Sequence, residues 1–279
     1  MKRPFLFGLP VLLALVVGGC DTTRLPTGSV AERVVPDPPM DVFLLIGQSN
    51  MAGRGAVEDG DRRTTPGLYA VAGDGGWALA RDPLHSDKPR VAGVGPGLAF
   101  GRAMLAIRPG RRVGLVPAAV GGTSITRWVP GAYDPATGSH PYDDAIARAR
   151  AVLDERGGTL AGVLWHQGES DSGDTSSDGH EARLVELVER LRSEFDQPGL
   201  PFVAAYLAPY YVEGHPGARA VNAALGRLPA RVAATAVVTT EGLADGGDGT
   251  HLDAPSAREL GRRYATAMQR LLESRPRCS

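Results

Sequence analysis

A hydroxyl, an imidazole and a carboxylate that could act together stand at Ser49, His251 and Asp248. A serine hydroxyl is a weak nucleophile at neutral pH and needs a neighbouring base. Histidine suits that task because its ordinary pKa, about 6.5, lets it take up and return a proton. Asp248 precedes His251 by three residues, so a turn would bring its carboxylate to the far ring nitrogen. We therefore predict a nucleophile, a general base and an orienting acid at these positions.

Each of the three residues also has an ordinary structural interpretation. A lone serine after a strand usually caps a helix, and Gly47 before Ser49 permits a sharp turn in either case. Asp248 could cap the last helix, which would leave His251 as a surface residue. The chemical interpretation therefore depends on other segments bringing matching groups to the same place.

Acyl transfer also requires hydrogen-bond donors where the oxyanion develops. The backbone N–H groups of Ser49 and Gly122 are candidates, since glycine lets the main chain approach a ligand closely. The side-chain amide of Gln167 is a third candidate, and its alternative role is to brace a loop.

Short apolar runs alternate with amphipathic runs along the chain. The strand-like runs cover residues 42–46, 113–116, 160–165, 202–207 and 235–239. The helix-like runs cover residues 97–107, 142–156, 180–195, 218–228 and 256–274, the third with a possible cap at Asp178. Continuous apolar strands indicate a sheet that is covered on both faces. This order predicts an α/β fold, a three-layer flavodoxin-like α/β/α domain with a parallel sheet of about five strands.

Reactive residue types follow four of the predicted strands. They lie in segments 47–50, 121–123, 166–169 and 248–251. Ligands of open parallel sheets bind outside the carboxyl ends of the strands, so we expect these segments to meet at one rim. Residues 54–94 break the alternation with many glycines and prolines, and we expect a long surface insertion with room for a short irregular strand.

The composition indicates a folded domain without a broad cationic surface. Hydrophobic residues make up 43% of the 279 residues, and 30 Lys and Arg nearly balance 31 Asp and Glu. Nucleic-acid binding is therefore not expected. The length fits one α/β domain.

The N-terminus has the form of a lipoprotein signal peptide. Lys2 and Arg3 precede an apolar stretch, and small residues lead into Cys20. We predict cleavage after residue 19, a lipid on the Cys20 thiol as the membrane contact, and an exported protein of the bacterial cell envelope. The alternative is an ordinary secretory signal. Residues 20–39 would then be a flexible tether and residues 40–279 the folded domain.

Five motifs occur in an order that resembles the SGNH hydrolase superfamily. More narrowly, they are similar to the sialate O-acetylesterase-related group that includes carbohydrate esterase family 6, the acetylxylan esterases. The motifs are Gly47-Gln48-Ser49-Asn50-Met51, Gly95-Pro96-Gly97-Leu98-Ala99-Phe100, Gly121-Gly122-Thr123-Ser124-Ile125 with Trp128, His166-Gln167-Gly168-Glu169-Ser170-Asp171 and Asp248-Gly249-Thr250-His251-Leu252. Together they span residues 41 to about 265, almost the whole predicted domain.

The resemblance implies an SGNH-type fold and assigns roles to the rim residues. Ser49 would be the nucleophile, His251 the base and Asp248 its partner, while Ser49, Gly122 and Gln167 would donate to the oxyanion. In the general superfamily an asparagine in the third block is such a donor, and Gln167 stands in that segment here.

Three further rim residues have less direct expected roles. Glu169 competes with Asp248 as the acid that orients His251. Gln48 and Asn50 are expected to shape the turn and the floor of the pocket.

No metal or cofactor is expected. Asp171, Asp174 and Asp178 lack the spacing of a calcium loop, which favours a solvated acidic loop. His166 and Glu169 lack a third ligand at a recognisable spacing.

Several other residues are weaker candidates. Arg127 and Trp128 would line a sugar subsite, or they would be a packed tryptophan beside an exposed arginine. Four histidines are expected to be structural or solvent-facing: His85, His140, His180 and His215.

We therefore expect a serine esterase that removes O-acetyl groups from an acetylated carbohydrate, of acetylxylan or sialate type, through an acyl-enzyme. Two alternatives stay open, a lipid or aryl esterase on the same scaffold and a lipid-anchored glycan-binding protein without catalysis. Aromatic residues are only 6% of the chain, which argues mildly against a lipid substrate. No protein partner is predicted.

Overall fold

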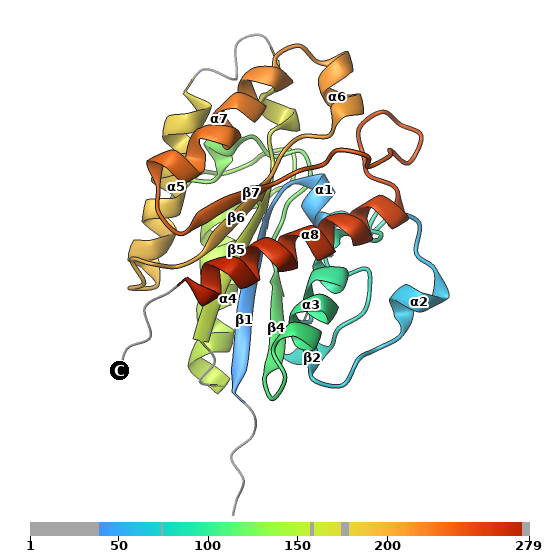
Figure 1. Cartoon of the computed structure of the whole chain (residues 1–279), viewed down its shortest axis with the longest axis vertical. Coiled ribbons are helices and arrows are strands. Elements are labelled where there is room, and N and C mark those ends of the chain that lie inside the picture. The colour runs from blue at the N-terminus through green and yellow to red at the C-terminus, as the bar shows by residue number, and fades with distance from the viewer. Residues whose placement is uncertain (1–38, 74, 157–158, 174–178, 275–279) are drawn as a thin grey trace, which may run out of the picture. The chain divides into compact units, whose positions relative to one another are not determined.

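Seven strands form one sheet in the computed structural model, which describes residues 39–73, 75–156, 159–173 and 179–274 (Figure 1). The strands are β1 (Met40–Gly47), β2 (Leu68–Val71), β3 (Trp77–Leu79), β4 (Arg112–Pro117), β5 (Thr159–His166), β6 (Phe202–Ala205) and β7 (Thr235–Val238). All five predicted strands are present. The prediction of about five strands was short by β2 and β3.

The strand order places β1 in the middle of the sheet. The order is β3-β2-β4-β1-β5-β6-β7, and all neighbours are parallel except the antiparallel pair of β2 and β3. The five predicted strands alone follow the flavodoxin order 2-1-3-4-5. After β1 the chain forms β2, β3 and β4 on one side of it and then crosses to β5 on the other side. Folds of this kind bind ligands at such a switch point.

The insertion extends the sheet instead of only covering it. Within residues 54–94, β2 pairs with β4, and β3 forms the outer edge with Leu79 exposed. Each strand has only three or four residues, which is too short for a clear apolar pattern.

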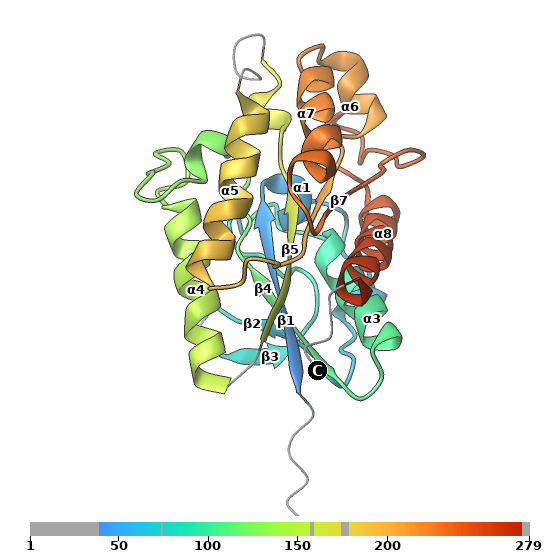
Figure 2. The same ribbon diagram turned by 60° about the vertical axis from the view of Figure 1, so that its left-hand side comes forward.

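Helices cover both faces of the sheet (Figures 1 and 2). Their bounds are α1 (Ser49–Ala52), α2 (Asp59–Arg62), α3 (Pro96–Ile107), α4 (Pro141–Arg156), α5 (His180–Glu194), α6 (Pro209–Gly214), α7 (Ala218–Arg231) and α8 (Ala254–Glu273). The five predicted helices are confirmed to within three residues at each end, and the predicted cap Asp178 lies outside the described residues. None of these described helices is long and apolar enough to cross a membrane.

The side chains of β1 alternate between the two layers. Val42, Leu44 and Ile46 join the core under α4, α5 and α7, whereas Phe43 and Leu45 join the core under α3 and α8. All five are at most 1% exposed. A strand that is buried on both faces cannot shift its register without exposing one of these sets, so the position of its carboxyl end is strongly fixed.

Gly47, at the end of β1, lies where no side chain fits. Its φ is +124°, and a Cβ there would lie 2.1 Å from the carbonyl oxygen of His166 on β5. The chain can therefore turn from β1 into α1 only with glycine at this position.

We predict that Gly47→Ala is far more destabilising than Gly110→Ala. Gly110 also has a positive φ, +81°, but nothing lies within 4 Å of its Cβ position, so alanine there should cost about 1–2 kcal/mol. Gly47→Ala must in addition push β1 and β5 apart. Urea unfolding of both variants measures the difference, and equal losses would contradict the steric argument.

Candidate active site

The four rim segments meet in one open groove at the carboxyl ends of the central strands. Segment 47–50 leads from β1 into α1, segments 121–123 and 166–169 follow β4 and β5, and segment 248–251 lies in the loop before α8. The groove has a volume of about 410 Å³. Its lining residues are Gln48, Ser49, Arg54, Lys88, Val91, Gly121, Gly122, Glu169, Ser170, Tyr211, His215, Thr250 and His251.

Ser49, His251 and Asp248 form a continuous chain of hydrogen bonds. Ser49 Oγ lies 2.9 Å from His251 Nε2, and His251 Nδ1 lies 2.6 Å from Asp248 Oδ2. With a carboxylate as its partner, Nδ1 carries the hydrogen, which leaves Nε2 to accept the hydroxyl proton of Ser49. The geometry therefore suits transfer of a proton from Ser49 to His251.

Asp248 is held in its ionised form. Partial burial opposes ionisation, but hydrogen bonds from the backbone and ring of His251 and from the backbone of Thr250 outweigh it and lower the pKa of Asp248 to about 2. The backbone N–H of His251 donates to Asp248 Oδ1 at 2.7 Å. Asp253, not Asp248, caps α8 by accepting from the N–H of Ser256.

The backbone N–H groups of Ser49 and Gly122 are available to a ligand. Neither has an acceptor among the described residues, and both residues line the groove. Ser49 is the first residue of α1, where the N–H has no partner within the helix. Two backbone donors therefore lie in the groove that also holds the Ser49 hydroxyl.

Gln167 does not face the groove. It is fully buried, and its Nε2 donates to the carbonyl of Thr123 at 3.1 Å, to Gln48 Oε1 at 3.2 Å and to Asp171 Oδ2. These internal acceptors leave no amide hydrogen of Gln167 for an oxyanion. The geometry favours the alternative that Gln167 braces the loop after β5.

Asn50 connects three of the four segments. Its Nδ2 donates to Glu169 Oε1 at 2.5 Å and to the carbonyl of Thr250 at 3.1 Å, and its Oδ1 accepts from the N–H of Leu252 at 3.0 Å. Gln48 Oε1 accepts from the N–H of Ser170. Both side chains thus connect the turn after β1 to other rim segments, and of the two only Gln48 is among the residues that line the groove.

The carboxylate of Glu169 binds Asn50, and no described hydrogen bond joins it to His251. Its Oε1 accepts from Asn50 and lies 3.9 Å from His166 Nε2, and the structure describes no contact of its carboxylate with the ring of His251. The geometry therefore favours Asp248 as the orienting acid.

Comparison with known proteins identifies the family. The family model of carbohydrate esterases described as sialic acid-specific acetylesterase matches residues 39–270. The chain belongs to this carbohydrate esterase family. A probable carbohydrate esterase of Arabidopsis thaliana is 34% identical over 192 residues, which are 62% of this chain and 71% of that protein.

Solved structures share the fold of this carbohydrate esterase. The Arabidopsis thaliana protein superimposes with a TM-score of 0.73 at 31% identity and covers 84% of this chain and 99% of its own. NanS gives 0.67 at 20% identity, covering 87% and 100%, and a carbohydrate acetylesterase from Xanthomonas citri gives 0.65 at 20%, covering 84% and 57%. The predicted family resemblance and the three-layer α/β fold are confirmed.

One other prediction for the esterase needs correction. Asp171 is buried and accepts the N–H of Ile125 at 2.8 Å, so the prediction of a solvated loop was wrong for this residue; Asp174 and Asp178 lie outside the described residues. Within the described ranges, no cluster of three His, Cys, Asp or Glu side chains could hold a metal.

Trp128 is packed in the core. It is 1% exposed, and its ring meets Trp165 edge-on at 5.4 Å. Arg127, which is partly exposed, lies 3.6 Å from Asp134. Neither Arg127 nor Trp128 lines the groove, so the packed alternative is the one that fits.

Several groove residues were not predicted from the sequence. His215 lines the groove and stacks on Tyr211 with ring centroids 4.0 Å apart. Arg54, Lys88 and Val91 come from the insertion. None of these residues stands directly after a predicted strand. The expectation that functional residues follow the strand ends therefore did not include them.

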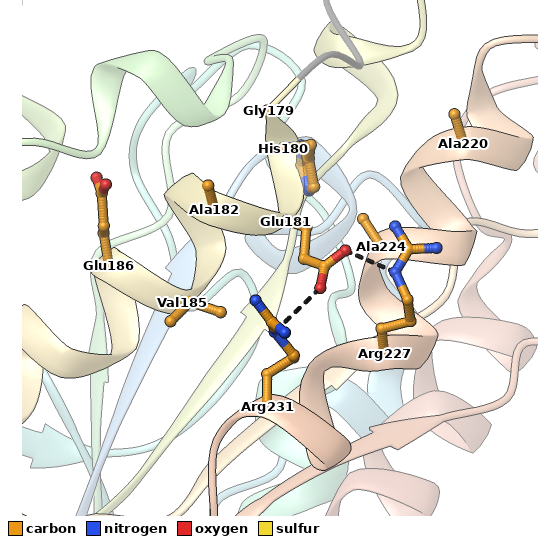
Figure 3. Close-up of a pocket in the computed structure, with 10 residues that line it drawn as sticks. All are labelled: Gly179, His180, Glu181, Ala182, Val185, Glu186, Ala220, Ala224, Arg227 and Arg231. Atoms are coloured by element: carbon orange, nitrogen blue, oxygen red, sulfur yellow. Dashed lines mark hydrogen bonds and ion pairs between the residues drawn. The ribbon is translucent and has the colours of Figure 1, made fainter.

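A second hollow lies between α5 and α7, away from the rim (Figure 3). Glu181 there accepts from Arg227 Nε at 2.6 Å and lies 3.4 Å from Arg231 Nε. Its described lining includes none of the four rim segments. The hollow therefore has no part in the chemistry of the groove.

His180 begins α5 beside this hollow and is fully buried. Neither ring nitrogen has a hydrogen-bond partner among the described residues. Burial, together with the charge of Arg183, lowers the pKa of His180 to about 4. His85 is buried as well, so both belong to the structural histidines, whereas His140 and His215 are exposed.

We predict that Asp248→Asn lowers kcat by about 10²–10⁴-fold, because an amide no longer stabilises the charged imidazole that forms during proton transfer. Glu169→Gln keeps an oxygen for Asn50 and should cost less than about tenfold. Steady-state kinetics on an acetate ester separates the two. Equal losses would contradict the assignment of Asp248.

We also predict that His180 makes the fold sensitive to acid. The folded protein keeps His180 neutral down to about pH 4, whereas the unfolded chain binds a proton below about pH 6.5. The free energy of unfolding should therefore fall as the pH drops from 6.5 to 4. In His180→Leu the free energy of unfolding should change less with pH. Some pH dependence should persist, because burial also lowers the pKa values of His85 and His166. Urea unfolding at several pH values measures this pH dependence. The same dependence in His180→Leu as in the parent would contradict the prediction.

Proposed function

We propose that the protein is a serine-dependent carbohydrate O-acetylesterase that works through an acetyl-enzyme. The observation that carries the proposal is the hydrogen-bond chain from Ser49 Oγ through His251 to Asp248, with distances of 2.9 and 2.6 Å. The available N–H groups of Ser49 and Gly122 in the same groove support it. A nucleophile, a base, an orienting acid and oxyanion donors are the parts that acyl transfer needs.

In the first half-reaction, His251 Nε2 takes the proton of Ser49 as Oγ bonds to the acetyl carbonyl carbon. The carbonyl electron pair moves to oxygen, which accepts hydrogen bonds from the N–H groups of Ser49 and Gly122. Collapse breaks the ester C–O bond, and His251 passes its proton to the sugar oxygen that leaves. The product is a free sugar hydroxyl and an acetyl ester on Ser49.

In the second half-reaction, His251 removes a proton from water, whose oxygen attacks the acetyl ester. The same two N–H groups bind the second oxyanion. When it collapses, His251 returns the proton to Ser49 Oγ, and acetate leaves. Asp248, ionised above about pH 2, stabilises the charged imidazole in both steps.

The groove supports a sugar ester more than a lipid ester. It is open and lined mainly by charged, hydroxyl and glycine residues, with Val91 as its only aliphatic hydrophobic side chain among the described lining residues. A long acyl chain would find little apolar surface there. The relatives named as carbohydrate esterases favour an acetylated glycan of acetylxylan or sialate type.

A catalytically silent glycan-binding role fits less well. Such a protein has no need to hold Ser49 Oγ against a base at 2.9 Å. Keeping a carboxylate ionised behind that base also serves proton transfer more directly than sugar binding.

We further propose export and lipid attachment at Cys20, which belongs to the part of the chain outside the described residues. Intact mass analysis of protein from the membrane fraction tests this. A mature N-terminus at Cys20 that carries acyl chains is expected, and retention of residues 1–19 would contradict it.

We predict that Ser49→Ala abolishes hydrolysis of p-nitrophenyl acetate and of acetylated xylan or sialic acid, because no other residue of the groove is held against His251. The variant should keep the thermal unfolding temperature of the parent within a few degrees. Release of acetate measures activity, and a butyrate or octanoate ester in parallel tests the lipid alternative. Undiminished turnover by Ser49→Ala would contradict the mechanism.

A further inference from the structure

A buried ion pair contacts the turn that carries Gly122, one of the proposed oxyanion donors. Arg54 Nη2 lies 2.7 Å from Asp87 Oδ2, and the two side chains are only 7% and 3% exposed. The same carboxylate oxygen accepts the N–H of Gly121 at 2.8 Å. Asp87 therefore binds the peptide group between Val120 and Gly121, which directly precedes the peptide group that carries the Gly122 N–H.

Arg54 also packs against this turn. A Cβ on Gly121 would lie 2.4 Å from Arg54 Nη2 and 2.9 Å from Asp87 Oδ2, so both charged groups pack against the Gly121 backbone. Arg54 Nη1 also donates to the carbonyl of Gly53 at 2.7 Å, just after α1. The pair thus connects the segment that carries Ser49 to the turn that carries Gly122.

A buried ion pair of this kind is not expected to add much to the stability of the fold. Removing two charges from water costs much of what their attraction returns, and well-packed apolar residues often do as well. Burial alone would raise the pKa of Asp87, but hydrogen bonds from Arg54 and from the Gly121 N–H bring it below its usual value, so the carboxylate is charged at neutral pH. A charged acceptor binds a backbone N–H more strongly than a neutral one.

We propose that Asp87 and Arg54 are positioning residues, which hold the Gly121-Gly122 turn so that the Gly122 N–H stays directed at the oxyanion. This inference rests on the proposed function. Neither side chain takes part in proton transfer. Their effect is on the transition state, because the oxyanion exists only there.

The test is Asp87→Asn, which keeps the shape but removes the charge and turns an amide toward two donors. We expect kcat for an acetate ester to fall about 10- to 100-fold while KM changes less than about threefold. Binding of a small alkylboronic acid, which forms a tetrahedral adduct with the serine, should weaken by a similar factor. A purely structural role predicts neither the kcat–KM split nor the weaker boronate binding.

The chain offers a matched control in Asp61→Asn. Asp61 is 2% exposed, pairs with Arg258 at 2.6 Å, and accepts the backbone N–H of Glu58 at 2.9 Å. It lies in the same insertion but does not line the groove. This variant should lower the unfolding temperature and leave kcat unchanged.

A second variant covers the case in which Asp87→Asn does not fold. Arg54→Lys keeps the positive charge but not the guanidinium contact with Gly121, and it should lower kcat about three- to tenfold. A kcat within twofold of wild type in the folded Asp87→Asn, or in Arg54→Lys if the former does not fold, would overturn the inference. An equal loss of kcat in Asp61→Asn would also overturn it.

The Ser49→Ala variant in the same assay distinguishes the two levels of the proposal. Turnover by Ser49→Ala would overturn the proposed function and this inference with it. An inactive Ser49→Ala together with a fully active Asp87→Asn would overturn the inference alone.

Discussion

The hydrogen bond between Ser49 Oγ and His251 Nε2 joins residues 202 positions apart, and the rest of the site depends on it. Asn50 stabilises the contact without touching the imidazole. Its amide binds the carbonyl of Thr250 and the N–H of Leu252, the residues on either side of His251. The backbone around His251 is therefore hydrogen-bonded to the side chain of Asn50, the residue next to Ser49. The ring itself keeps both nitrogens for Ser49 and Asp248, so it can be held in place and still exchange protons.

Polar groups at the rim lie at two depths. Gln167 and Asp171 are at most 1% exposed and bind each other and the backbone of the loop after β4. The side chains of His251 and Asp248 are 27% and 55% exposed. The deeper groups satisfy one another and rigidify the loops. The outer pair is open to solvent, and the three hydrogen bonds that Asp248 accepts lower its pKa to about 2.

Sequence alone predicts the parts of this structure that follow from simple periodicity. The five central strands are buried on both faces, so they are continuous apolar runs, and the residues after them converge because parallel strands end at one edge. Side-chain direction beyond the strand end does not follow from such a pattern. Gln167 precedes Gly168, whose φ of +150° turns the chain. Packing therefore decides whether the amide of Gln167 enters the groove or the core. Arg54 and Asp87 were missed because they belong to the insertion, whose strands are too short to predict.

Two kinds of segment therefore form the groove. Reactive groups come from the ends of the central strands and the loop before α8, where the doubly covered sheet fixes their positions. Much of the wall comes from elsewhere: Arg54, Lys88 and Val91 from the insertion, and Tyr211 and His215 from α6 and its end. In the proposed reaction, bonds change only at the acetyl group, and the sugar would lie against the wall. We therefore expect the residues that select the glycan to differ from those that carry out the reaction. Arg54 and Asp87 are the exception, because they connect the insertion to the Gly121-Gly122 turn.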